Sequence, residues 1–93
     1  MPKEWIFEKI KVECHAGYKG EESPRVFIHL GKHYEIREIL DRWYEEGPTP
    51  PTTRYEYFKV KAAEGEIFLL RHVPSEMSWN LCRKVPAPPF SNN

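Results

Sequence analysis

The chain has 93 residues, of which 40% are hydrophobic, 14% aromatic and 30% charged. This length suits one small domain with a single core, and the composition is too apolar for a disordered chain. The 14 basic residues balance the 14 acidic ones. Zero net charge argues against a dedicated non-specific binder of nucleic acid, which is normally strongly basic.

The beginning of the sequence does not resemble a targeting segment. The first ten residues, MPKEWIFEKI, are broken by charges before any apolar run forms, unlike a signal peptide. No stretch of the sequence approaches the roughly 20 apolar residues that a membrane span needs. We therefore expect a soluble, cytoplasmic protein.

The first predicted strand spans Ile6 to His15, where apolar side chains alternate with charged ones. Glu8 interrupts the apolar face, so we expect the regular strand to begin near Lys9. The segment Ala16–Pro24 that follows is polar and contains two glycines, which predicts a loop.

The stretch Pro24–Trp43 contains the clearest turn signal in the chain. Glycine at the first position of a two-residue loop, Gly31-Lys32, is typical of a type II′ hairpin turn, because that position needs a positive φ. This loop places Leu30 opposite His33. Strand alternation then puts an aromatic set on one face, which we assign to the core: Phe27, His29, Tyr34 and Ile36. The opposite face carries a second apolar row: Val26, Ile28 and Leu30.

The stretch Glu35–Glu46 is compatible with two structures. Four apolar side chains have helical spacing and favour a helical turn over residues 38–44: Ile36, Ile39, Leu40 and Trp43. The hairpin, however, demands extended structure through Ile36, and no turn residue follows it. We therefore favour a bent strand with a bulge near Glu38, which would turn Ile39 and Trp43 inward.

Two further strands form a predicted second hairpin. Arg54–Ala62 alternates most clearly, and Glu66–His72 is the returning strand. The register between them is open. A two-residue loop pairs Val60 with Leu69, whereas a three-residue loop pairs Val60 with Phe68.

The last predicted strand is Trp79–Arg83, and a proline-rich segment follows it. We expect one β-rich domain over residues 1–85 and a flexible proline-rich tail over residues 86–93. The fold class is mostly β, a single small antiparallel curved sheet or open barrel of five or six strands. The predicted core contains these side chains: Phe27, Ile36, Trp43, Phe58, Val60 and Trp79.

The cysteines and histidines lack the spacing of a metal site. Cys14 and Cys82 form no CxxC pair, and a zinc site would need two more ligands. We expect both to be small buried side chains, with a disulfide only if the first and last strands are neighbours. His29 and His33 have His-x3-His spacing, but the hairpin places them on opposite faces. We predict no metal and no other cofactor.

One strand face combines aromatic and basic side chains in the way that single-strand nucleic-acid binders do: Tyr55, Tyr57, Lys59 and Lys61. The more ordinary interpretation is a solvent-facing side of an antiparallel strand, where tyrosine and lysine are common. That interpretation is favoured, since acidic residues elsewhere cancel the charge.

Three other motifs are explained better by ordinary structural roles than by function. Asp41-Arg42-Trp43 fits an ion pair beside a core tryptophan better than a recognition patch. Arg71-His72 has no carboxylate or nucleophile at a defined spacing for acid–base chemistry. Pro86-Ala87-Pro88-Pro89 matches the loose PxxP ligand pattern, but an unstructured tail is much the better interpretation. No catalytic motif is present in the sequence, so we predict that the chain is not an enzyme.

Hydrophobic and turn positions between Pro24 and Leu81 carry a resemblance to a known family. They are Pro24-x-x-Phe27, Gly31-x-x-Tyr34-x-Ile36-x-x-Ile39-Leu40-x-x-Trp43, Phe58-x-Val60, Phe68-x-Leu70-Arg71 and Trp79-x-Leu81. On these positions the chain resembles a family of small uncharacterised prokaryotic β-rich domains. Some similar domains are appended to proteins that resemble lesion-bypass DNA polymerases. That resemblance implies an accessory role in a nucleic-acid or repair complex, and no activity.

Together these patterns predict a non-enzymatic binding or assembly module. The first hypothesis is protein–protein association with an unknown partner or with itself, as a homodimer, through Val26, Ile28 and Leu30. The alternative is a single-stranded nucleic-acid binding accessory domain that uses the Tyr55–Lys61 face.

Overall fold

The structure is a computed structural model that describes residues 5–16, 22–47 and 53–84. A short 3-10 helix, η1 (Pro74–Glu76), joins the last two of its strands. Within the described ranges, no helix combines the length and apolar character that crossing a membrane requires. The strands are β1 (Trp5–Ala16), β2 (Glu22–His29), β3 (Lys32–Glu46), β4 (Arg54–Ala62), β5 (Ile67–Val73) and β6 (Ser78–Lys84).

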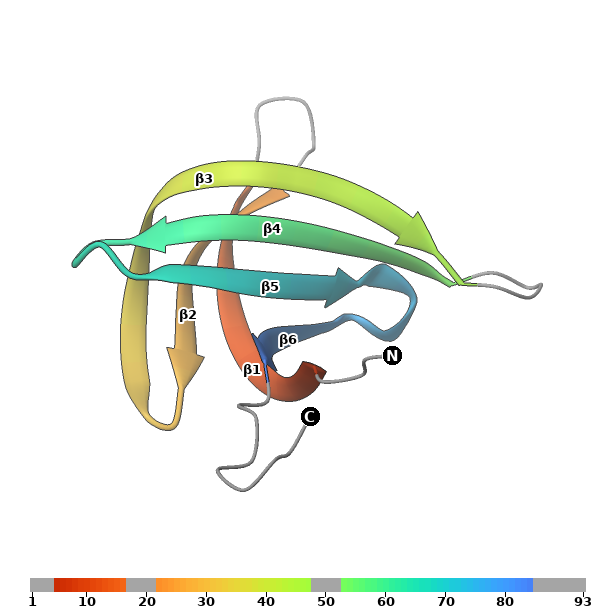
Figure 1. Cartoon of the computed structure of the whole chain (residues 1–93), viewed down its shortest axis with the longest axis horizontal. Coiled ribbons are helices and arrows are strands. Elements are labelled where there is room, and N and C mark those ends of the chain that lie inside the picture. Colours follow the sequence, from red (N-terminus) through yellow and green to blue (C-terminus); the bar gives the residue numbers. More distant parts are fainter. Residues whose placement is uncertain (1–4, 17–21, 48–52, 85–93) are drawn as a thin grey trace, which may run out of the picture.

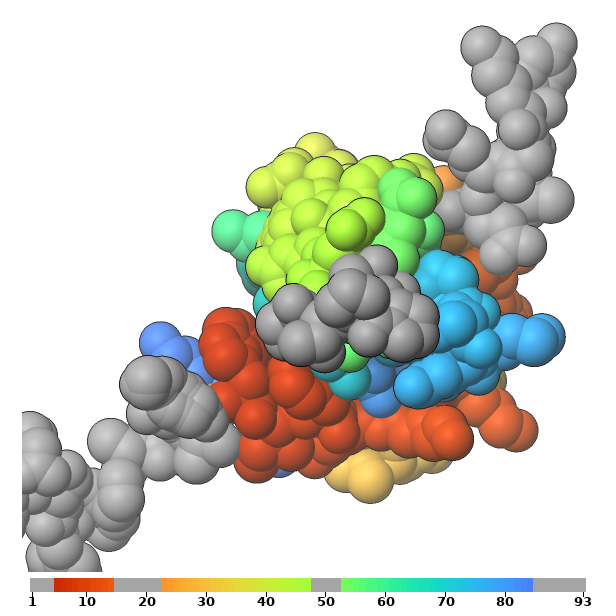
Figure 2. Space-filling model, turned by 90° about the vertical axis from the view of Figure 1, so that its right-hand side faces the viewer, coloured from red at the N-terminus to blue at the C-terminus, as the bar shows by residue number. Residues whose placement is uncertain are grey.

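The strands form a closed antiparallel barrel in which each strand pairs with the next along the chain (Figure 1). β1 also pairs with β6, which closes the barrel. β3 is the longest strand and arches over β4 and β5 (Figure 1). Seen from the side, β1 (red) lies below β3 (yellow-green) (Figure 2). The prediction of a small, mostly β fold is confirmed.

The core fills the inside of the barrel with side chains from all six strands. Phe27 stacks on Tyr34 with ring centroids 4.8 Å apart, and Phe68 meets both rings edge-on at 5.0 Å. Four of the six predicted core residues are buried, and Trp79 packs against them while staying partly exposed. The central cluster is Ile10, Phe27, Ile36, Phe58, Val60, Leu70 and Leu81.

The first hairpin turns one residue earlier than the sequence predicts. Its loop is Leu30-Gly31, and both residues have positive φ, 53° and 79°, as a type I′ turn requires. Phe27 therefore faces Tyr34 instead of Ile36. The predicted Gly31-Lys32 loop and its type II′ geometry are wrong. The predicted faces are still correct, because moving a two-residue loop by one position shifts the pairing by two residues and preserves alternation.

The turn predicts a stabilising substitution, Leu30→Asn. Leu30 is 91% exposed, so its side chain contributes little packing, while a left-handed backbone costs a leucine roughly 1–2 kcal/mol. Asn-Gly is the preferred type I′ pair. We expect thermal unfolding to shift upward by about 4–8 °C for each kcal/mol gained. A melting temperature at or below that of the parent would contradict this account, and Gly31→Ala should lower it.

β3 contains two irregularities where the sequence predicts one. The pairing with β4 shifts between Ile36 and Glu38, near the predicted bulge, and again between Ile39 and Asp41. The first shift turns Ile39 inward, as expected. The second reverses the alternation, so Trp43 lies outside the barrel opposite Tyr57. The assignment of Trp43 to the core is therefore wrong, and residues 38–44 form a continuous strand without the alternative helical turn.

The N-terminal strands begin earlier than predicted. β1 starts at Trp5 and β2 at Glu22. Glu8 lies opposite Leu81 on the inward side of β1, where an isolated carboxylate would be costly. It is held by His29 Nε2 at 2.6 Å and by Arg83 at 3.1 Å. The polar residue that interrupts the apolar pattern therefore has its own partners and does not end the strand.

The register between β4 and β5, which the sequence leaves open, is defined in the structure. Val60 lies opposite Phe68, which corresponds to the three-residue loop. A second inward polar pair lies further along this hairpin, where His72 Nδ1 contacts Glu56 Oε1 at 3.1 Å. The predicted tail, residues 86–93, lies outside the described residues.

Candidate binding groove

Outward-facing side chains form rows that run across the sheet from β1 through β6, β5 and β4 to β3. In one row, Phe7 lies opposite Cys82, and Cys82 lies opposite Leu69. In the next row, Arg71 lies opposite Tyr57, and Tyr57 lies opposite Trp43. Because such cross-strand neighbours lie about 5 Å apart, side chains distant in sequence become one surface.

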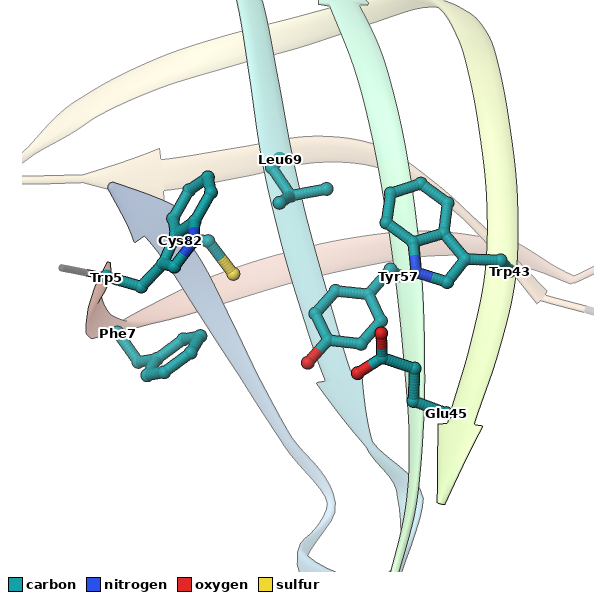
Figure 3. A pocket seen from close by; sticks show the side chains of 7 residues that line it. All are labelled: Trp5, Phe7, Trp43, Glu45, Tyr57, Leu69 and Cys82. Carbon is teal, nitrogen blue, oxygen red and sulfur yellow. The ribbon is translucent and has the colours of Figure 1, made fainter. Parts of the chain in front are cut away.

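A groove of about 290 Å³ lies on this outer face (Figure 3). Leu69 and Cys82 form its floor between the walls. Trp5 and Phe7 stand on one side, and Trp43 and Tyr57 stand on the other (Figure 3). An adjoining hollow of about 500 Å³ shares Trp5, Trp43, Leu69 and Cys82 with the groove, so the depression continues along the strands toward Lys59 and Ile67.

The aromatic walls are partly open to solvent. Trp5 is 47% exposed and Phe7 is 43% exposed. Trp43 and Tyr57 are half-buried and stack with their ring centroids 5.3 Å apart and an interplanar angle of 13°. Large apolar side chains that remain exposed side by side on one face are typical of an interaction site.

The groove is close to neutral. Glu45 reaches its rim beside Tyr57 (Figure 3), and Lys59 lines the adjoining hollow. Burial raises the pKa of the Tyr57 hydroxyl above its ordinary value, and the Glu45 carboxylate adds to the rise. Tyr57 is therefore a protonated hydrogen-bond donor throughout the neutral range.

Arg71 packs against Phe7, which lies in one wall of the groove. Its guanidinium donates to Asn80 Oδ1 at 3.1 and 3.0 Å. It also lies 3.9 Å from the centre of the Phe7 ring and 5.0 Å from that of Tyr55. An arginine engaged in this way fixes the orientation of Phe7.

The four side chains predicted as a nucleic-acid face do share one outer face. Tyr55 and Tyr57 are half-buried, and Lys59 and Lys61 are exposed. Tyr57 and Lys59 line the groove and its continuation, whereas Tyr55 lies under the Arg71 guanidinium. Their role in binding nucleic acid stays a prediction.

The predicted association row lies elsewhere on the barrel. Leu30 projects from the tip of the first hairpin, while Val26 and Ile28 are half-buried. Ile28 borders a separate hollow of about 360 Å³ together with Met77 and Trp79. Self-association through this row stays a prediction.

The remaining motifs are separated by the fold. Arg71 faces outward, whereas His72 faces inward and stacks on Trp79 at 4.4 Å, so the two do not form an acid–base pair. In Asp41-Arg42-Trp43, the Arg42 guanidinium turns inward over the Phe58 ring at 4.9 Å. The PxxP segment lies outside the described residues.

The cysteines do not approach one another. β1 and β6 are neighbours, but Cys82 lies opposite Phe7, and Cys14 lies opposite Pro24 of β2. The two cysteines are not joined by a disulfide bond. Among residues 5–16, 22–47 and 53–84, no three or more His, Cys, Asp or Glu side chains gather as a metal site would require.

The sequence model described as "Domain of unknown function (DUF6504)" matches residues 1–85. The chain belongs to this family. No curated protein and no solved structure is similar enough to count as a match. Membership in DUF6504 therefore supports an uncharacterised small domain and assigns no activity to the groove.

Most of the groove residues differ from the site residues predicted from the sequence. Trp5 and Phe7 lie before Lys9, near which the regular first strand is expected to begin, and the sequence predicts Trp43 in the core. The signal that could have found them is the alternation Trp5-x-Phe7-x-Lys9, which gives the outer face of β1 its own apolar side chains.

The burial of Cys82 in the floor of the groove predicts that its thiol is unreactive. Its side chain is 6% exposed, and burial raises the pKa of the thiol from 9.0 to about 11. The reactive thiolate is therefore about 100-fold scarcer near neutral pH than for an ordinary thiol of pKa 9.0. We expect slow alkylation of Cys82 by iodoacetamide in the folded protein, measured by peptide mass spectrometry. Labelling as fast as in denaturant would contradict this.

Proposed function

We propose that the domain is a non-enzymatic binding module whose outer groove accepts an extended, proline-containing polypeptide segment. The observation that carries the proposal is the aromatic pair of walls, Trp5 with Phe7 and Trp43 with Tyr57, facing one another across an apolar floor (Figure 3). Aromatic-lined grooves of this kind are a recurring way to bind polyproline II segments.

The chemistry of such a segment suits the groove. A polyproline II chain presents flat pyrrolidine rings that pack against aromatic faces, and its carbonyl groups have no internal hydrogen-bond partners. The Trp43 indole N–H and the protonated Tyr57 hydroxyl are donors at the groove wall. Because the bound shape is already favoured in the free peptide, ordering it costs little conformational entropy.

The charge of the groove favours a neutral peptide over a polyanion. Its rim carries one carboxylate, Glu45, and its continuation carries one ammonium group, Lys59. Arg71, the nearest guanidinium, is engaged with Asn80 and two rings. Strong binding of a phosphate backbone would need several cations without carboxylates among them.

Single-stranded nucleic acid is the second candidate ligand. The specific observation in its favour is the stacked Trp43–Tyr57 pair with Lys59 exposed on the same face, because bases stack on such rings. The resemblance to domains appended to lesion-bypass-polymerase-like proteins also fits this candidate. The Glu45 carboxylate at the rim of the groove weighs against it.

Calorimetric titration separates the two candidates. We expect an uncharged synthetic proline-rich peptide to bind the 93-residue chain with an affinity that barely changes with salt, because no ion pair is involved. A single-stranded oligothymidylate should give no heat at low salt. Binding of the oligothymidylate with a steep salt dependence, and none of the peptide, would replace this proposal by the second candidate.

A further inference from the structure

We infer that the groove is occupied in cis by the chain's own proline-rich segment, residues 86–90, which competes with other peptides for the same site. This inference rests on the proposed function of the groove. It adds a specific occupant and a consequence, namely that the domain holds its own ligand and releases the groove only to a competing segment.

The chain leaves β6 beside one wall of the groove. β6 ends at Lys84, and Lys84 lies directly opposite Trp5, one wall of the groove. Strand partners of this kind lie about 5 Å apart. A chain leaving β6 therefore starts at the rim of the groove. At about 3.1 Å per residue in polyproline II form, five residues reach roughly 15 Å, far enough to follow the groove.

The composition of the segment suits the groove. Residues 85–93, VPAPPFSNN, carry no charged side chain, in keeping with the near-neutral groove. Pro86, Pro88 and Pro89 favour polyproline II structure. Phe90 adds an aromatic ring that can lie on the exposed Trp5 and Phe7 rings. The family match stops at residue 85, so this segment lies outside what the chain shares with DUF6504.

Tethering raises the local concentration of the segment at the groove. A short tether holds a ligand at roughly millimolar local concentration. If the dissociation constant of the segment is ten times lower than that concentration, the segment occupies the groove in about ten of every eleven molecules. An outside peptide then binds about tenfold more weakly than it would to an empty groove.

The test compares the intact chain with a variant carrying Pro86→Ser, Pro88→Ser and Pro89→Ser. These substitutions keep the length and charge of the segment and remove its polyproline preference. The probe is the uncharged synthetic proline-rich peptide, and calorimetry measures its affinity for each chain. A control variant with Asn92→Ser and Asn93→Ser changes the same tail beyond the proline-rich segment.

We expect the triple variant to bind the probe about tenfold more tightly than the intact chain, at every protein concentration, and the control to match the intact chain. Equal affinities for all three chains would overturn the inference and leave the proposed function standing. No binding to any chain would overturn both. A gain that appears only at high protein concentration, together with a dimer in sedimentation, would overturn docking in cis in favour of exchange between chains.

Discussion

Replacing Phe58 by alanine is expected to leave the chain largely unfolded. Phe58 is 1% exposed, and its ring lies 5.4 Å from that of Trp79 and beneath the Arg42 guanidinium. Truncating a buried phenylalanine costs about 3–5 kcal/mol. The free energy of unfolding of a native domain is only about 5–15 kcal/mol, and small domains lie toward the lower end of that range.

Urea unfolding followed by far-ultraviolet circular dichroism measures this effect. The matched control is Lys61→Ala, on the outer face of the same strand, which should shift the free energy of unfolding by less than about 0.5 kcal/mol. A Phe58→Ala midpoint close to that of Lys61→Ala would show that the cavity collapses or that Phe58 is peripheral.

Trp43→Ala is expected to weaken peptide binding strongly and to lower the stability of the fold only slightly. Trp43 is half-buried on the outer face and stacks on Tyr57, so its loss removes a pair contact of about 0.5–1.5 kcal/mol. As a central aromatic of a binding site, it is expected to contribute about 2 kcal/mol or more to the affinity for the proline-rich peptide. That loss corresponds to more than a tenfold increase in the dissociation constant.

The control for Trp43→Ala is Met77→Ala. Met77 is an equally conspicuous exposed apolar side chain, but it lies between η1 and β6, away from the groove. We expect Met77→Ala to bind the peptide like the parent. If Trp43→Ala binds the peptide with unchanged affinity, the groove is not the binding site. If Trp43→Ala is largely unfolded, Trp43 belongs to the core, as the sequence predicts.

The inward faces of β2 and β4 could be predicted from the sequence because alternation is a local property. Phe27, Phe58 and Val60 were assigned to the core from period-two patterns alone, and they are buried. The predicted hairpin loop lies one residue late, because Gly31 satisfies the glycine signal in either a type I′ or a type II′ turn. Only the backbone of Leu30, with its positive φ, distinguishes the two.

The groove could not be predicted because it depends on two non-local features. Trp43 reaches the outer face only through the second shift in β3, at Leu40, which no glycine or proline marks. Trp5 and Phe7 join it only because β1 pairs with β6 and closes the barrel. Closure brings residues from both ends of the chain together, and strand pairing at such separation leaves no trace in a local pattern.

The most direct test of the groove is a nuclear magnetic resonance titration of the 15N-labelled chain with the uncharged proline-rich peptide. The chain has three tryptophans, and each gives one indole N–H signal. Trp5 and Trp43 line the groove, whereas Trp79 packs against the core inside the barrel. We expect the signals of Trp5 and Trp43 to move with peptide concentration while that of Trp79 stays in place. Movement of Trp79 alone, or of none of the three, would contradict the assignment of the groove as a peptide-binding site.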